Sequence, residues 1–431
     1  MTIGKTAIIS SLLLVSFSAF SASPADSTAA SRLTIGGYGE ATFTHGFYSN
    51  NPYRYMYPDR FTASKGFSQV DLPHVVVMMG YDFGSGWTMG TEIEFEHGGV
   101  EAAIEVEGDE AIEVEHEIER GGEVYLEQFW LQKSWSKSAN LRAGMIIVPI
   151  GLTNNRHEPD GFFTVFRQEA ESTILPCTWH QIGLSFWGRT GDWRYEAQLL
   201  PGLNSRFFNN SGWIAGGSAS PYEYTVANEP AGALRLDNYS LKGMRVGLSA
   251  YAGGTYNDAY PNSTSTNAVR GIAYVAALDF EFKSAHVIAR GNFDYGYLAN
   301  AANIGTSNKN SDNSTFSPYQ HTFVGERAWA FGHEVGFDLL SYGQNAHGRQ
   351  LFVFGRLDRF DSFVPAAGQT DYLWADRTVY SLGINYRPIP QIIVKAQASY
   401  AKMARKNDGT PEYNPEPAIS LGITYAGFFK K

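Results

Sequence analysis

The sequence of 431 residues contains one cysteine, Cys177. A single cysteine excludes a disulfide within the chain, so no internal covalent cross-link stabilises the fold. We interpret Cys177 as a small, partly buried side chain rather than as a reactive thiol. The fold must therefore depend on hydrogen bonds and packing.

Long hydrophobic runs are also absent after the N-terminus. Residues 1–22 contain Lys5, an apolar run of about a dozen residues and a small-residue end, which is typical of a secretory signal peptide. Beyond them, no run reaches the roughly 20 apolar residues that a membrane-spanning helix requires. The sequence therefore predicts an exported chain whose mature part, residues 23–431, is either soluble or a membrane β-barrel.

Charged residues are scarce, at 18% of the chain, and they are unevenly distributed. Residues 92–123 hold 13 of the 43 acidic residues and a single arginine, while the whole chain has a formal net charge of −10. The acidity is therefore concentrated in one segment. Because a nucleic-acid-binding protein needs a basic face, we predict no nucleic-acid partner.

Aromatic residues and glycine are abundant, and apolar residues recur with a period of two. In AISLGITYAGFF (418–429), Ile419, Leu421 and Ile423 alternate with small or polar residues, which indicates a strand with one apolar face. About sixteen segments show this alternation, and their lengths are near the 9–11 residues with which a tilted strand crosses a bilayer. The segments are 33–43, 70–83, 87–96, 123–135, 141–148, 180–189, 193–200, 233–241, 244–254, 270–282, 286–298, 327–340, 349–360, 377–387, 391–403 and 418–429.

The connections between these segments alternate between short and long. Examples of short ones are 84–86 and 190–192, and examples of long ones are 149–179 and 201–232. An outer-membrane barrel has this arrangement, with short periplasmic turns and longer external loops. We therefore predict an all-β fold: one transmembrane antiparallel β-barrel of about sixteen strands over residues 23–431, in which the last strand pairs with the first.

The polar positions of the strands predict the lumen of this barrel. If the apolar residues face lipid, Arg194 and Glu196 of segment 193–200 face inward. The same reasoning along other strands predicts a hydrated wall with charges of both signs, around a lumen too wide for wall side chains to fill. The predicted wall residues are Arg142, Arg194, Glu196, Arg290, Asp294, Arg356 and Lys395.

The long connection 149–179 follows the fifth strand and is predicted to fold into the lumen as a constriction loop. An ordinary surface loop is the alternative. His157 and Glu158 are adjacent, but no HExxH pattern or second ligand cluster follows, so we predict no metal site, catalytic residue or cofactor. The residues predicted to set the field at the constriction are Arg156, His157, Glu158, Asp160, Arg167, Glu169 and Glu171.

The connection 97–122 is predicted to be an acidic external loop. The sequence AIEVE occurs twice, at 103–107 and 111–115, around Gly108 and Asp109, which predicts a hairpin over 101–123 that extends beyond the membrane. Its acidic residues have two interpretations: they keep the surface solvated, or they form a rim that collects cations at the mouth.

The run RAGMIIVPIGLTNNRHEPDGFFTVFRQEAESTILPCTWHQIGLSFWG (142–188) resembles the phosphate-selective porin O and P family of Gram-negative bacteria, as do IGGYGEA (35–41), FEHG (95–98) and GEVYLEQFWL (122–131). The resemblance covers about a third of the mature chain. It implies a trimeric sixteen-stranded channel for small hydrophilic solutes, surrounded by lipid and lipopolysaccharide of the outer membrane. Members of this family select anions with rows of Arg and Lys along the pore, and no such row can be matched residue by residue in this sequence. The predicted basic wall residues are accompanied by acids such as Glu92 and Glu94, so the wall carries charges of both signs.

These features favour a porin for passive diffusion of small hydrophilic solutes or ions in the outer membrane of a Gram-negative bacterium. A substrate-specific channel for phosphate or an oligosaccharide is the alternative within the same class. An outer-membrane enzyme is disfavoured, because His286 and His333 lie on predicted strands without an evident partner in the sequence. An adhesin or structural barrel with a blocked lumen is the remaining hypothesis.

Overall fold

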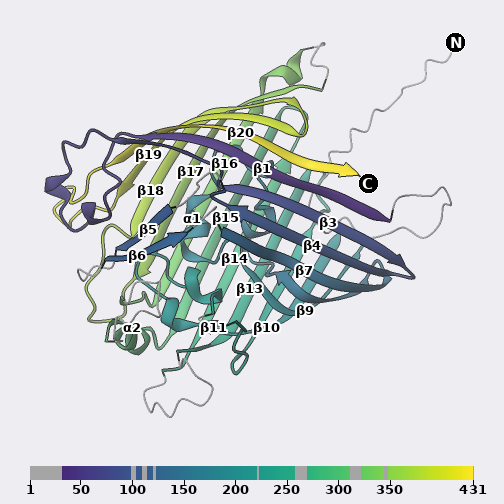
Figure 1. The fold of residues 1–431 in the computed structure, drawn as a ribbon, viewed down its shortest axis with the longest axis horizontal. Helices are drawn as coiled ribbons and strands as arrows, with labels where there is room; N and C mark the ends of the chain where they lie inside the picture. Colours follow the sequence, from purple (N-terminus) through teal and green to yellow (C-terminus); the bar gives the residue numbers. More distant parts are fainter. Residues whose placement is uncertain are drawn as a thin grey trace.

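The computed structural model describes residues 32–98, 103–108, 114–119, 123–220, 223–257, 269–310, 322–343 and 348–430. The predicted signal peptide, residues 1–22, lies outside this range. Sixteen long strands form one closed antiparallel barrel (Figure 1), which confirms the predicted fold class. None of the helices in the described ranges has the length and hydropathy needed to cross a membrane.

Every barrel strand pairs antiparallel with the next one along the chain, and the last strand pairs with the first. The closing pair runs from Gly46 opposite Ala418 to Ile35 opposite Lys430, so no open edge is left in the membrane. The barrel strands are β1 (Leu33–Gly46), β3 (His74–Gly84), β4 (Trp87–Glu96), β7 (Glu123–Ser136), β8 (Ala139–Ile147), β9 (His180–Thr190), β10 (Trp193–Pro201), β12 (Pro230–Asn238), β13 (Met244–Tyr256), β14 (Gly271–Lys283), β15 (Val287–Ala299), β16 (Arg327–Asp338), β17 (Gln350–Val364), β18 (Asp376–Ile389), β19 (Ile392–Met403) and β20 (Glu416–Lys430).

The strands bury their polar residues and expose their apolar ones. On β20, Leu421 and Ile423 are more than half exposed, whereas Ser420 and Thr424 are each 2% exposed. This pattern is the reverse of that in a water-soluble protein, and it suits a barrel whose outer surface contacts lipid. The alternation that predicted the strands therefore also predicted correctly which side chains point outward.

One predicted strand is interrupted. The sequence predicts a single strand over 70–83, but the structure has β2 (Phe67–Asp71) and then β3, with Pro73 between them. Proline has no amide hydrogen to donate to a neighbouring strand, so it breaks the ladder at this point. Both pieces pair with β1, because β2 lies beside residues 42–46 and β3 beside residues 33–39.

The connections between the barrel strands carry the remaining short elements. As predicted, the acidic connection contains a hairpin of β5 (Ala103–Gly108) and β6 (Val114–Glu119). Its tip, residues 109–113, lies outside the described residues. The other elements are α1 (Glu169–Ile174), α2 (Ala301–Lys309), β11 (Leu203–Asn204) and the 3-10 turns η2 (Pro52–Arg54), η3 (Pro58–Arg60), η4 (Asn154–Arg156), η5 (Ser205–Phe207), η6 (Ala215–Ser218) and η7 (Leu339–Tyr342).

Part of the long connection 201–232 turns into the barrel. The sequence assigned residues 201–232 to an external loop, but residues 203–214 pack against the inner wall near one mouth of the barrel. The Trp213 indole N–H donates to the Gly325 carbonyl at 3.0 Å, and its ring lies so close to Gly296 of β15 that a Cβ there would collide with it. The sequence did not predict this inward packing, which buries apolar side chains of the loop inside the mouth.

Candidate functional site

The loop of residues 149–179 crosses the lumen and is attached to the strands on its far side. Val165 N donates to Gln397 Oε1 at 2.8 Å, and Lys395 Nζ donates to the Pro159 carbonyl at 2.7 Å; both wall residues lie on β19. The short helix α1, within this loop, packs against β16 and β17. The loop thus lies inside the barrel and contacts its wall through many polar groups.

The shape of the loop is fixed by Glu171. Its carboxylate accepts hydrogen bonds from the backbone N–H groups of Leu152 at 2.8 Å, Thr153 at 2.9 Å and Asn154 at 3.1 Å. Burial raises the pKa of Glu171 to about 7 even though these three donors favour its charged form. Gly151 has a φ of 73° and lies against the same carboxylate, so a larger residue there would displace it.

Five charged residues of alternating sign form one row across neighbouring strands of the wall. Arg245, Glu281, Arg290, Glu334 and Arg356 lie directly opposite one another on β13, β14, β15, β16 and β17. The row contains close ion pairs, such as Arg290 with Glu334 at 2.5 Å and Arg245 with Glu281 at 3.2 Å. Each arginine in the row therefore has a carboxylate beside it, which cancels most of its field.

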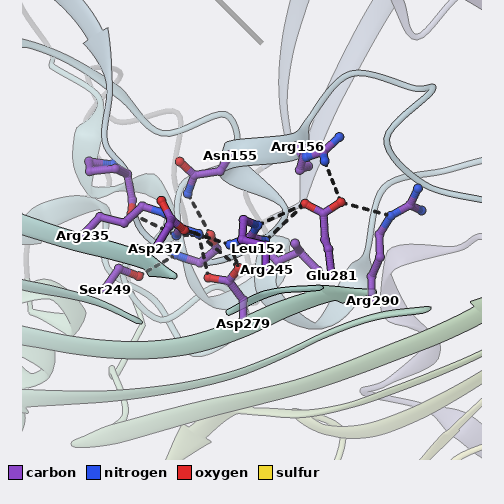
Figure 2. Close-up of polar contacts among 12 residues, drawn as sticks. Leu152, Asn155, Arg156, Arg235, Asp237, Arg245, Ser249, Asp279, Glu281 and Arg290 are labelled. Atoms are coloured by element: carbon purple, nitrogen blue, oxygen red, sulfur yellow. Dashed lines mark hydrogen bonds and ion pairs between the residues drawn. The ribbon is translucent and has the colours of Figure 1, made fainter. Parts of the chain in front are cut away.

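A second group of charges joins this row to the loop (Figure 2). Asp279 lies 3.0 Å from Arg235 and 2.6 Å from Arg245, and Arg235 also donates to the Gly151 carbonyl at 3.0 Å. From the loop, Arg156 reaches Glu281 at 2.6 Å. The position of the loop therefore depends on the same ion pairs that neutralise the wall.

Gly247 provides the space for this group. It lies on β13 opposite both Asp237 and Asp279. A Cβ at this position would be 2.6 Å from Arg245 Nη1 and 2.8 Å from Asp279 Oδ2, so a side chain there would push these groups apart.

The opposite part of the wall is acidic. Glu40 of β1, Glu92 and Glu94 of β4 and Glu127 of β7 all point inward, and each is at most 6% exposed. The loop brings Arg167 to 4.0 Å from Glu94. The described lumen therefore has two unlike sides. On β12–β17 the positive and negative charges balance, and this side is called the balanced wall; on β1, β4 and β7 carboxylates predominate, and this side is called the acidic wall.

His157 extends from the loop into the acidic wall. Its Nε2 lies 3.7 Å from Glu92 Oε1 and 3.9 Å from Glu127 Oε2. Burial alone would lower the pKa of His157, but the carboxylates of Glu127, Glu158 and Glu92 outweigh it and raise the pKa to about 10. The negative potential at this point therefore favours any bound cation.

The structure places all seven predicted wall residues on the lumen face, although few of them meet one another. Arg194 pairs with Glu196 at 2.5 Å, whereas Arg142 donates to Gln132 at 3.0 Å instead of to an acid. Asp294 is completely buried beside Asn292, which donates to it. Arg290 and Arg356 belong to the alternating row and Lys395 is bonded to the loop.

The seven residues predicted at the constriction make different kinds of contact in the structure. Arg156, His157 and Arg167 contact the walls as described above. Glu158 is buried, and Glu169 lies 3.8 Å from Arg377. Asp160 contributes its backbone carbonyl, which accepts from Arg387 at 3.1 Å, and Glu171 organises the loop itself.

Several residues of the site were missed from the sequence. In segment 233–241, Arg235 and Asp237 alternate with Leu234 and Leu236, so the period of two already placed them inside. Glu127 gave no such signal, because it occupies an irregular position of its strand. The missed residues are Glu40, Glu127, Arg235, Asp237, Arg245, Asp279, Glu281 and Glu334.

The two histidines considered as catalytic groups have different surroundings. His286 Nδ1 lies 2.7 Å from Ser341 Oγ and its ring stacks on Tyr342, two contacts that were not evident in the sequence. Asp338 Oδ1 accepts from the Leu340 and Leu351 backbone N–H groups, and among the described residues no hydrogen bond joins a carboxylate to His286. His333 lies against the ring of Phe280, with ring centroids 5.7 Å apart.

A small cavity of about 20 Å³ lies between the loop and β15–β17. It is bounded on the loop side by Phe162 and Gln168 and on the wall side by charged residues of the alternating row. A space of this size holds about one water molecule. Its charged lining residues are Arg156, Arg290, Glu334 and Arg356.

Cys177 gives a direct test of how the loop is packed. Burial raises the pKa of its thiol to about 11, although the neighbouring Arg167 opposes this change. We therefore expect maleimide to label the folded protein slowly at pH 7, with a rate that rises about tenfold per pH unit up to pH 9. The same chain unfolded in guanidinium is the control and will label rapidly; equal rates in both states would contradict the partly buried position.

Comparisons with known proteins give a fold but no family. No protein-family model matches the chain. An uncharacterized protein of Aquifex aeolicus (strain VF5) is 26% identical over 374 residues, which cover 84% of this chain and 74% of that protein.

Two solved structures share the architecture. Pseudomonas putida OprB at high pH has a TM-score of 0.51 at 10% identity, over 92% of this chain and 94% of that one. Salmonella typhi OmpF in complex with daunomycin has a TM-score of 0.50 at 9% identity, over 91% of this chain and 97% of that one. At this identity the likeness concerns the fold alone. The chain is therefore a closed sixteen-stranded barrel with the architecture of outer-membrane porins and channels.

Proposed function

We propose that this chain is an outer-membrane channel of a Gram-negative bacterium, through which small hydrophilic solutes or ions diffuse passively. The observation that carries the proposal is a charged lumen inside a closed barrel with an apolar outer surface. Lipid and lipopolysaccharide would surround the barrel. Assembly into a homotrimer, which the resemblance to the phosphate-selective porins implies, is part of the same proposal.

In this proposal the loop 149–179 is the constriction. It presents Arg156 to the balanced wall and His157 and Arg167 to the acidic wall, so a solute passing the loop meets charges of both signs. Permeating molecules would therefore have to be polar and small.

The distribution of charge favours cations over anions. The wall arginines Arg235, Arg245 and Arg356 each have a carboxylate within 3.0 Å, so none of these three offers a free guanidinium to phosphate. The acidic wall has a smaller share of compensating cations. A phosphate-selective channel, as in the family that the sequence resembles, is thus the less favoured alternative.

Ion selectivity in a planar lipid bilayer tests this proposal. With a KCl gradient across the membrane, we expect discrete conductance steps and a reversal potential whose sign corresponds to preference for K⁺. Replacing both Glu92 and Glu94 by Gln should reduce the preference, because it removes two carboxylates from the acidic wall.

The matched control is Glu412→Gln, which removes one carboxylate from an exposed part of the β19–β20 loop. It should leave the reversal potential unchanged. Strong anion selectivity would contradict the preference for cations, and the absence of any conductance step would contradict the channel itself.

A further inference from the structure

Three buried side chains from different parts of the chain converge inside the lumen. Glu92 comes from β4, Glu127 from β7 and His157 from the loop, and each is at most 5% exposed. The distances from His157 Nε2 to the two carboxylates, 3.7 and 3.9 Å, are too long for hydrogen bonds. Glu92 Oε1, Glu127 Oε1 and His157 Nε2 are buried without a hydrogen-bond partner among the described residues.

An irregularity in the sheet directs Glu127 into this group. Glu92 lies opposite Gln128 and Ile93 lies opposite Leu126, so Glu127 is the extra residue of a β-bulge in β7. As a result, Glu127 and Gln128 both point inward although they are consecutive. Without the bulge, strict alternation would send one of the two outward to lipid.

Neighbouring groups orient the other two side chains. Gln128 Nε2 donates to Glu92 Oε2 at 2.5 Å, which leaves Oε1 of the same carboxylate facing His157. His157 Nδ1 lies 3.2 Å from the Asn154 carbonyl, so the ring donates its Nδ1 hydrogen there and turns Nε2 toward the carboxylates. Metal-binding histidines are held in the same way, with the second nitrogen donating to a carbonyl or carboxylate.

We propose that Glu92, Glu127 and His157 bind a first-row divalent metal cation, such as Zn²⁺, Fe²⁺ or Mn²⁺, inside the lumen. Two ligand atoms bound to one tetrahedral ion are roughly 3.3–3.5 Å apart, so only a small side-chain movement is needed to close the site. One imidazole with two carboxylates suits these metals, whereas Mg²⁺ and Ca²⁺ prefer oxygen ligands alone. The sequence gave no sign of the site, because its ligands lie far apart along the chain.

A second group of similar composition lies next to the first. His74 Nδ1 is 2.6 Å from Glu94 Oε1 and 3.7 Å from Glu96 Oε1. Glu92, Glu94 and Glu96 follow one another along the inner face of β4, at steps of about 7 Å. The acidic hairpin connection begins directly after Glu96, so the two groups lie in succession on a path from this connection into the lumen.

If the acidic connection collects cations, this path would lead them to the buried site. Metal ions gathered by the external carboxylates would pass His74, Glu94 and Glu96 and then reach the buried site. Transport along the path rests on the proposed function, because it requires an open channel. Binding at Glu92, Glu127 and His157 does not require conduction and is tested separately.

A binding experiment uses the folded, full-length protein in detergent after removal of metals. Equilibrium dialysis against Zn²⁺ should show saturable binding, and Co²⁺ should give the visible absorption of an ion with an imidazole ligand. We expect His157→Gln and Glu92→Gln each to weaken Zn²⁺ binding at the inner site at least about tenfold. Far-UV circular dichroism checks that each variant retains its sheet.

His286→Gln is the matched control, since it removes a histidine from the connection between β14 and β15, where it contacts Ser341 and none of the three proposed ligands, and should leave binding unchanged. Unchanged binding by both inner-site variants would overturn the proposal, and so would a loss of binding that follows only His74→Gln. If the inner-site variants do not fold, the Co²⁺ spectrum of His74→Gln decides, because this change removes the imidazole of the second group: an imidazole-ligated spectrum supports the site, and its absence overturns it.

The result is separable from the proposed function. Ion conductance without metal binding would refute the metal site alone, and metal binding without conductance would refute the channel alone. Conductance recorded in metal-free buffer and again with Zn²⁺ provides both readings from one preparation.

Discussion

Deleting residues 152–176 should raise the single-channel conductance at least about threefold, because this segment occupies the lumen that sixteen strands enclose. Phe163 and Val165 of the segment are fully or almost fully buried inside the barrel. The ends of the loop are close together, since Val148 N donates to the Trp179 carbonyl at 2.8 Å. A short Gly-Ser linker can therefore replace the deleted segment without separating β8 from β9.

The control for this deletion removes residues 405–414 of the β19–β20 loop, most of which are exposed. Because these residues do not enter the lumen, the conductance should remain at its original value. An equal conductance in the protein that lacks 152–176 would mean that the narrowest part of the pore lies elsewhere, for example at the inward-turned residues 203–214.

Asp279→Asn should lower the free energy of unfolding by about 3 to 5 kcal/mol, as is typical when one partner of a buried ion pair is removed. Asp279 is completely buried and faces two guanidinium groups, those of Arg235 and Arg245. Asparagine has nearly the same shape, so the substitution removes charge without creating a cavity. Tryptophan fluorescence during guanidinium unfolding in detergent measures the change.

The matched variant is Glu412→Gln, which breaks a 4.0 Å ion pair between the partly exposed Glu412 and the exposed Lys406. Its effect should stay within about 0.5 kcal/mol, because exposed pairs contribute little. If Asp279→Asn unfolds at the same denaturant concentration as the original protein, the ion-pair group does not stabilise the wall, and the attachment of the loop through Arg235 must be reconsidered.

The strands of this protein could be predicted because lipid imposes a simple rule on their sequence. Leu421 and Ile423 are apolar on one side of β20 and Ser420 and Thr424 are polar on the other, and many of the other strands show a similar alternation, although β3 buries Val76 and Met78 on its inner side. The break at Pro73 was overlooked because apolar residues lie on both sides of it. The local alternation of apolar and polar residues was therefore enough to predict most of the strands.

The lumen was harder to predict, because its contacts join residues that are distant in the sequence. Arg235 donates to the Gly151 carbonyl, and no pattern in the sequence around Arg235 or around Gly151 predicts that contact. The bulge at Glu127 has a similar origin, since only pairing with β4 reveals an extra residue. Trp213 could equally have belonged to an exposed loop, and its place inside the mouth depends on the space beside Gly296.

The unequal distribution of charge between the two sides of the lumen has a consequence for molecules that carry no net charge. Between the acidic wall at β4 and the arginine-containing row on β13–β17, the electric field points across the pore rather than along it. A zwitterion such as an amino acid would turn its ammonium end toward the carboxylates of β4 and its carboxylate end away from them, toward the charge-balanced row. The barrel would thus align dipolar molecules, water included, as they pass.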